Sequence, residues 1–267
     1  MGQMKQPAGW GVAAALVVIL VGCLGGASGA RFSPPSVELP SPSGTWNSPT
    51  ISDHLAGYVI GTGIGGVFDV RGEWRVPQIA ATCPSTPTFS SFYVGMDGYR
   101  IPFHTWEAVG SSTNCVGGAP VYYAWYQLYP IKYAKMPLAV SPADQLAGDV
   151  SYHSGAFSFS LKDLTTGKSF HTSINFTRAY RDSAEWVAQD PSPGGILASL
   201  TDFGWVTFTN ANATVRTPTG NVVTTPGNHP HTAVAMWNIR QTKVMASVGP
   251  LSSNGSVFRV TWKSRGP

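Results

Sequence analysis

The chain has 267 residues, 43% of them apolar and 12% aromatic, which is enough for one large domain with a substantial core. Charged residues make up only 11%, and the net charge of +4 is scattered without a Lys/Arg cluster, which argues against nucleic acid as a partner. Glycine (30) and proline (21) favour many short strands joined by turns over long helices.

Residues 1–30 carry the pattern of a targeting signal. Lys5 supplies a positive charge, and residues 11–24 form an apolar run that is short for a membrane span. Three outcomes stay open. The small residues 28–30 predict cleavage and release of the protein. The sequence Leu-Val-Gly-Cys ending at Cys23 resembles a bacterial lipobox, which would make Cys23 a lipidated membrane anchor. In the third outcome, the apolar segment 11–24 stays uncleaved and anchors the protein. We therefore expect an exported protein, either secreted or held at the cell surface as a lipoprotein.

Residues 31–50 are rich in serine and proline, which is typical of a flexible linker or a short pro-segment. The remaining residues, 51–267, are expected to form a single domain. Apart from Cys23, the chain has two cysteines, Cys83 and Cys115. An even pair in an oxidising compartment predicts one disulfide.

The first clear strand covers residues 68–76, where apolar residues and glycine alternate with four charged residues, so one face is buried and one is solvated. A second strand over 89–96 ends at the turn Asp97-Gly98. The strand over 121–129 carries aromatic residues on both faces, with Tyr123, Trp125, Gln127 and Tyr129 on one of them.

Further strands are predicted over seven segments of the second half of the chain: 157–161, 169–176, 183–189, 203–209, 234–239, 243–248 and 257–262. So many strands in one chain must stack as two sheets or close as a barrel. A strand with aromatic residues on both faces fits a sandwich, in which one face fills the core and the other lines a groove. The predicted fold class is therefore an all-β, two-sheet antiparallel sandwich.

Common catalytic and metal-binding patterns are absent, and the two histidines of the 229–231 loop are read as solvated, so we expect no metal and no cofactor. Glu185 stands out because it lies in an apolar strand next to Trp186. Partial burial raises the pKa of a carboxyl group and suits it to general acid or base work. The alternative is a structural glutamate that is hydrogen-bonded to a neighbouring strand.

Five blocks follow one another in an order that resembles the glutamic peptidases (the eqolisin family, peptidase G1, formerly A4), with the bacterial-type members as the nearest match. The resemblance covers residues 55–262. The blocks are Trp74-Arg-Val-Pro, Tyr93-Val-Gly-Met-Asp-Gly, Tyr123-Ala-Trp-Tyr-Gln-Leu-Tyr-Pro, Ser183-Ala-Glu-Trp-Val and Phe203-Gly-Trp-Val-Thr-Phe-Thr-Asn-Ala. The resemblance implies a concanavalin-like sandwich with a concave substrate groove, and an acid-acting endopeptidase with a peptide or protein substrate. We expect the protein to be a monomer.

The resemblance also implies roles for individual residues. Glu185 would activate the attacking water and then protonate the leaving nitrogen, while a glutamine amide would hold the water and stabilise the oxyanion. This chain has Ala108 where that glutamine is expected, and the adjacent Glu107 should point to the opposite face. Gln127 stands where the family usually has an acidic residue and is a candidate for a compensating amide. The groove would be lined by Tyr93, Asp97, Tyr123, Trp125 and Tyr129.

Two functions therefore compete. The first is an exported endopeptidase that cleaves at a reduced rate, because one oxyanion donor alone is worth roughly 10²–10³ in rate. The second is a non-catalytic descendant that binds a peptide or a glycan in the same aromatic groove. A third function, hydrolysis of a glycan, would need two carboxylates on either side of the scissile bond.

Overall fold

The computed structural model describes residues 32–33, 49–80, 83–99, 105–193 and 198–266, which all belong to one compact unit, Arg31–Pro267. The predicted signal, Cys23 of the lipobox and most of the Ser/Pro-rich segment lie outside these residues. Within the described ranges, no helix has the length and apolar character needed to cross a membrane.

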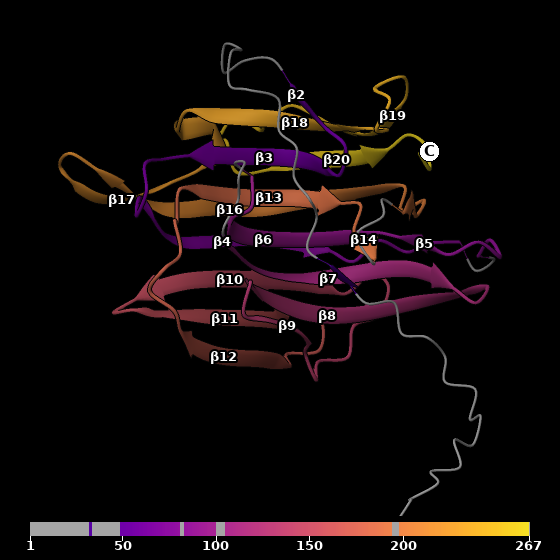
Figure 1. Cartoon of the computed structure of the whole chain (residues 1–267), viewed down its shortest axis with the longest axis horizontal. Coiled ribbons are helices and arrows are strands. Elements are labelled where there is room, and N and C mark those ends of the chain that lie inside the picture. Colours follow the sequence, from indigo (N-terminus) through magenta and orange to yellow (C-terminus); the bar gives the residue numbers. More distant parts are fainter. Residues whose placement is uncertain (1–31, 34–48, 81–82, 100–104, 194–197, 267) are drawn as a thin grey trace, which may run out of the picture. The chain divides into compact units, whose positions relative to one another are not determined.

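Two layers of antiparallel strands form the unit, as predicted (Figure 1). The layer that carries Glu185 is called the site sheet. Its strands, in spatial order, are β9 (Lys132–Lys135), β8 (Ala119–Tyr129), β7 (Trp106–Val116), β6 (Ser91–Asp97), β13 (Ser183–Gln189), β3 (Leu55–Gly61) and β18 (His231–Trp237). The short strand β2 (Thr50–Ser52) adds to β18 in parallel.

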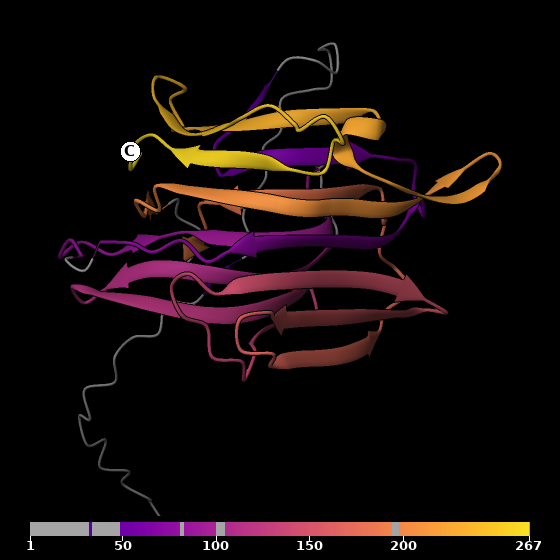
Figure 2. The same cartoon turned by 180° about the vertical axis from the view of Figure 1, so that it is seen from behind.

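The second layer, called the back sheet, faces the viewer in Figure 2. Its order is β12 (Ser169–Asn175), β11 (Ala156–Asp163), β10 (Gln145–His153), β4 (Val67–Arg75), β16 (Trp205–Thr217), β20 (Phe258–Trp262) and β19 (Val244–Val248). Strand β19 also pairs with β18, so the two sheets are continuous at one edge.

Short elements complete the described chain. Strand β17 (Gly220–Thr224) forms a hairpin with β16, β5 (Thr88–Phe89) pairs with β7 and β15 (Ser199–Leu200), and β1 (Phe32–Ser33) pairs with β14 (Ser192–Pro193). A 3-10 turn, Pro226–Asn228, precedes β18.

The main core lies between the two sheets and is rich in aromatic residues. Trp74 and Phe208 of the back sheet and Phe92 and Trp186 of the site sheet are all fully buried there. The Trp186 indole N–H donates to the Arg71 carbonyl at 2.6 Å, which links the layers. A Cβ at position 72 would lie 2.8 Å from the Trp186 ring, so only glycine lets the tryptophan pack this closely against β4.

The predicted disulfide is present. Cys83 and Cys115 are bonded, with 5.4 Å between their Cα atoms and a sequence separation of 32. The bridge ties the segment before β5 to the end of β7, which is a strand of the site sheet. Closing a loop of this length stabilises the fold by about 4 kcal/mol in the chain-entropy model.

Candidate functional site

Four residues on neighbouring strands of the site sheet lie directly opposite one another. Glu185 on β13 faces Gly95 on β6, Gly95 faces Ala108 on β7, and Ala108 faces Gln127 on β8. Directly opposed residues of antiparallel strands project to the same side, so this row lies on the outer face of the site sheet. Glu107 is opposite Met96 and Leu128 and therefore points into the sandwich, as predicted.

Gly95 keeps the middle of the row free of side chains. A Cβ there would lie 2.6 Å from the Glu107 carbonyl oxygen and 2.9 Å from the Ala108 Cβ, so no larger residue fits. Glu185 and Ala108 consequently face each other across two strand spacings, about 10 Å. A glutamine at position 108 would extend toward Glu185 over Gly95.

The Glu185 carboxyl group is held at both oxygens. The Tyr93 hydroxyl donates to Oε2 at 3.2 Å, and the Ser183 hydroxyl donates to Oε1 at 3.2 Å. Glu185 is 0% exposed, and this burial raises the pKa of its carboxyl group well above the ordinary value. Hydrogen bonds from Ser183, Tyr93 and the Tyr99 backbone lower the pKa, while the charge of Asp97 raises it. Glu185 is therefore the central titratable group of this face.

Aromatic rings pack around Glu185 and form a second apolar cluster on the outer face. The Tyr93 and Trp125 ring centroids are 5.8 Å apart, and Trp106 lies 5.3 Å from Tyr93 and 5.9 Å from Trp125. The expected aromatic surface is thus present beside Glu185, but it is packed and not open. Tyr93 is 1% and Trp125 2% exposed, because the rings bury one another.

Tyr123 and Tyr129, the other predicted groove residues, are half-buried on the same face of β8. The ammonium group of Lys135 lies 4.0 Å from the centroid of the Tyr123 ring. Trp106 and Ser183 belong to the site but were not predicted. Their signal in the sequence was strand alternation, since Trp106 is two residues from Ala108 and Ser183 is two residues from Glu185.

Gln127 does not sit where a compensating amide is needed. It shares the face and the row with Glu185, as expected, but β6 and β7 lie between them, a separation of about 14 Å between the strands. The Gln127 amide N–H instead donates to the Lys132 carbonyl at 3.1 Å. The aromatic neighbours of Gln127 suggested a place beside Glu185, but the strand order puts two strands between the two residues.

Asp97, which is expected to line the groove, lies at the end of β6, opposite Trp106 and two residues after Gly95. Its buried carboxylate accepts hydrogen bonds from the Thr105 hydroxyl at 2.6 Å and from the backbone N–H groups of Arg181 and Asp182, both at 2.7 Å. These contacts tie the end of β6 to the residues that lead into β13. Asp97 therefore helps to place the strand that carries Glu185.

Glu107 is a second buried carboxyl group behind the row. Both of its oxygens lack a hydrogen-bond partner among the described residues. Burial raises the pKa of Glu107 well above the ordinary value, and the neighbouring Asp97 raises it further. We therefore expect Glu107 to be protonated and neutral over the acidic range.

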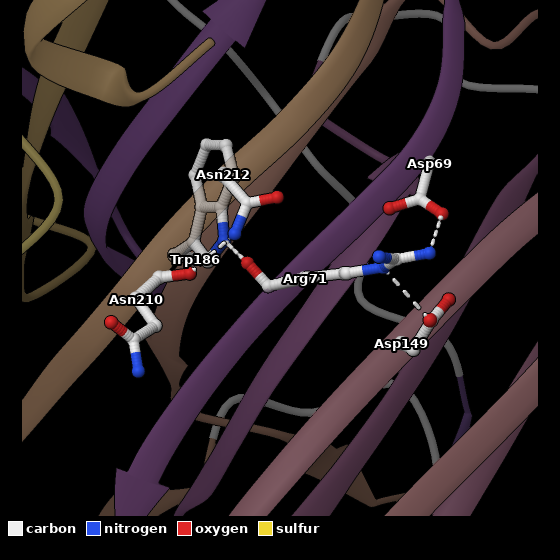
Figure 3. A network of polar contacts seen from close by, with 6 residues as sticks. All are labelled: Asp69, Arg71, Asp149, Trp186, Asn210 and Asn212. Atoms are coloured by element: carbon white, nitrogen blue, oxygen red, sulfur yellow. Dashed lines mark hydrogen bonds and ion pairs between the residues drawn. The ribbon is translucent and has the colours of Figure 1, made fainter. Parts of the chain in front are cut away.

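Another polar network lies on the outer face of the back sheet, away from Glu185 (Figure 3). The Arg71 guanidinium group binds Asp69 at 2.8 Å and Asp149 at 2.9 Å, beside a pocket of ≈ 280 Å³ that is also lined by Asn210 and Asn212. Because one guanidinium group bridges both carboxylates, they are not a free pair on either side of a bond, as hydrolysis of a glycan requires. Among the described residues, no group of side chains suits a metal ion.

Known proteins are similar to this chain in sequence. The sequence matches the Peptidase A4 family over residues 53–259. It is 30% identical over 216 residues to aspergillopepsin-2 of Aspergillus niger, covering 70% of this chain and 75% of that protein.

Solved structures of glutamic peptidases share the fold. Scytalido-glutamic peptidase, solved with a peptide-based transition state analog, superposes with a TM-score of 0.64 at 18% identity, covering 79% of this chain and 98% of that one. Aspergilloglutamic peptidase from Aspergillus niger gives a TM-score of 0.56 at 26% identity, covering 66% and 99%. The chain therefore belongs to the Peptidase A4 family, the glutamic peptidases.

Proposed function

We propose that this protein is an exported endopeptidase of the glutamic type in which the ionised form of Glu185 activates the water that attacks a peptide bond. One observation carries the proposal. The Glu185 carboxyl group lies in an aromatic cluster on the outer face of the site sheet, hydrogen-bonded by Tyr93 and Ser183 and separated from the Ala108 position only by Gly95. Family membership supports the reaction class, since relatives were solved with a transition state analog and with a tripeptide.

In this mechanism the ionised Glu185 takes a proton from water while the water oxygen bonds to the scissile carbonyl carbon. The carbonyl oxygen becomes an oxyanion, and Glu185 becomes neutral. Glu185 then gives the proton to the amide nitrogen, the C–N bond breaks, and the carboxylate is regenerated. Because Ala108 has no amide to stabilise the oxyanion, we expect a rate below that of relatives with glutamine there, by roughly 10²–10³ for one donor.

The disulfide supports a location outside the cytoplasm, because such bonds persist in oxidising compartments. Release after cleavage of the signal and a lipid anchor at Cys23 would both place the domain there. The substrate we propose is a peptide or an unfolded protein segment that lies across β13, β6 and β7, and no cofactor takes part.

The test is cleavage of a denatured protein between pH 2 and 8, followed by mass spectrometry. Glu185→Gln keeps the shape of the side chain and removes the base, so we expect cleavage to be lost. Glu73→Gln, on the outer face of the back sheet, is the matched control and should retain it. Equal cleavage by wild type and Glu185→Gln would refute the role of Glu185.

A second function is favoured by one observation, the alanine at position 108. If the protein only binds peptides, wild type and Glu185→Gln should both bind an unstructured peptide and leave it intact at every pH. Trp125 and Trp106 lie beside Glu185, so the intrinsic tryptophan fluorescence reports binding. Turnover by wild type rules this function out.

A further inference from the structure

We propose that the Tyr93 hydroxyl supplies the oxyanion donor that Ala108 cannot, an inference that rests on the proposed peptidase function. The missing amide leaves the developing negative charge without a donor from β7. Tyr93 stands on β6, the strand between Glu185 and Ala108, and it projects to the same outer face two residues before Gly95. Its hydroxyl already lies 3.2 Å from Glu185 Oε2.

The other polar groups around Glu185 are less suited to this role. Ser183 lies on the same strand as Glu185 and donates to the other carboxyl oxygen, at 3.2 Å. The Gln127 amide is engaged by the Lys132 carbonyl and lies three strand spacings away. Tyr93 is thus the residue on β6, the strand of Gly95, whose hydroxyl donates a hydrogen bond to the Glu185 carboxylate.

The charge changes during the reaction would free the Tyr93 hydroxyl when it is needed. At rest it donates to Glu185, and hydrogen bonds to charged acceptors are the stronger ones. When Glu185 takes the proton from water it becomes neutral, and a full negative charge appears on the carbonyl oxygen of the substrate. The hydroxyl should then donate to the oxyanion, because the donor follows the charge.

The surroundings of Tyr93 keep it protonated and rigid. Burial raises the pKa of its hydroxyl well above the ordinary value, and the Glu185 charge adds to this, while the Trp106 indole N–H acts against it. The phenol is therefore a donor across the whole working range. Its ring is fixed by Trp106 and Trp125 at centroid distances of 5.3 and 5.8 Å, so little reorganisation is required.

A buried donor nearby also indicates that this face accepts a carbonyl. The Trp125 indole N–H is buried without an acceptor among the described residues. Unpaired buried donors are uncommon and destabilising, so their presence in a native fold calls for a partner. A peptide carbonyl of the substrate would provide that acceptor next to Tyr93.

The experiment removes one oxygen atom. We expect Tyr93→Phe to lower kcat by roughly 10²-fold with little change in KM, each measured at the top of the variant's own pH profile. Tyr58→Phe is the control, because it removes a hydroxyl that donates to the Gly249 carbonyl at 3.0 Å and points away from the site face on β3. It should leave kcat unchanged.

A second variant separates catalysis from folding. Adding Ala108→Gln to Tyr93→Phe should restore far more activity than the same substitution adds to wild type, because the amide then replaces the lost donor. An unchanged kcat in Tyr93→Phe would overturn the Tyr93 role and leave that of Glu185 intact. If Ala108→Gln raised kcat by the same factor in wild type and in Tyr93→Phe, the Tyr93 role would likewise be overturned and the Glu185 role would stand. Absence of cleavage by wild type would overturn both proposals.

Discussion

Glu185 and Ala108 lie opposite the same residue, Gly95, from the two strands that flank β6. The glutamate is thus correctly placed for a partner that this chain does not provide. Since the row is set by backbone pairing and not by the side chains, the position should still accept an amide.

In the wild-type background Ala108→Gln is expected to raise kcat/KM by less than the roughly 10²-fold that a sole oxyanion donor is worth, because the Tyr93 hydroxyl already donates there. Steady-state kinetics on a fluorogenic peptide would measure the gain. Ala108 is fully buried, so thermal unfolding must show that the longer side chain is tolerated. A folded variant without any gain would mean that the gap over Gly95 is not the reaction centre.

Ser183→Ala should move the acidic limb of the pH–rate profile to higher pH. Burial raises the pKa of Glu185, and the Ser183 hydroxyl lowers it by stabilising the carboxylate, so its removal allows the pKa to rise. The base is then ionised only at higher pH. Ser173→Ala, which removes a hydroxyl on β12 that donates to the Phe157 carbonyl on β11, is the control. An unshifted limb would separate Ser183 from the catalytic group.

The local pattern of apolar and polar residues decides which strands can be predicted from the sequence. Strand β13 was predicted at its observed bounds, Ser183–Gln189, because apolar and aromatic residues mark it clearly. Strand β7 was missed, since both of its faces are buried but carry small polar residues at positions 111–114, which give no apolar alternation. Strands β3 and β10 were also missed, and glycines interrupt both.

The site was predictable only as far as one strand at a time. Glu185 could be found from its own segment, whereas the separation of Gln127 from it depends on the pairing of four strands. The role of Asp97 depends on backbone groups at positions 181 and 182, far away in sequence. Strand pairing and loop contacts of this kind are tertiary properties, which the apolar periodicity and the strand propensity of a single segment do not encode.

Carboxyl groups with raised pKa values should make the fold more stable in mild acid. Burial raises the pKa of Asp69 from 3.8 to about 6, with a further contribution from Asp149, and Arg71 acts against this. Between these values the folded state binds more protons than the unfolded state, so this group's contribution to stability falls as the pH rises from about 4 to 6. Asp69→Asn should therefore gain stability relative to wild type on going from pH 4 to pH 7, as measured by urea unfolding.

Asp163→Asn is the control, because its effect on stability should change with pH in the opposite direction to that of Asp69→Asn. Burial raises the pKa of Asp163, but hydrogen bonds from Thr166 and Thr165 outweigh it and hold the pKa below the ordinary value. Its stabilising contribution is present above the unfolded pKa and is lost as the pH falls. Asp163→Asn should thus lose stability relative to wild type as the pH rises from about 2 to about 5. Parallel pH profiles for both variants and wild type would contradict the assignment.

Asp97→Ala should lower both stability and activity, because it leaves two backbone N–H groups, of Arg181 and Asp182, without their acceptor. Losing these bonds should cost about 3 kcal/mol in the free energy of unfolding. The residues involved lead into β13, so Glu185 should also lose its fixed position relative to Gly95, and kcat should fall even where the protein is fully folded.

Asp144→Ala is the control, since Asp144 accepts the Ser141 N–H at 2.7 Å in a loop before β10, away from the row. Chemical unfolding and kinetics on the same samples would show a loss of stability in both variants but a loss of kcat in Asp97→Ala alone, and equal kcat values would leave Asp97 with a role in stability only.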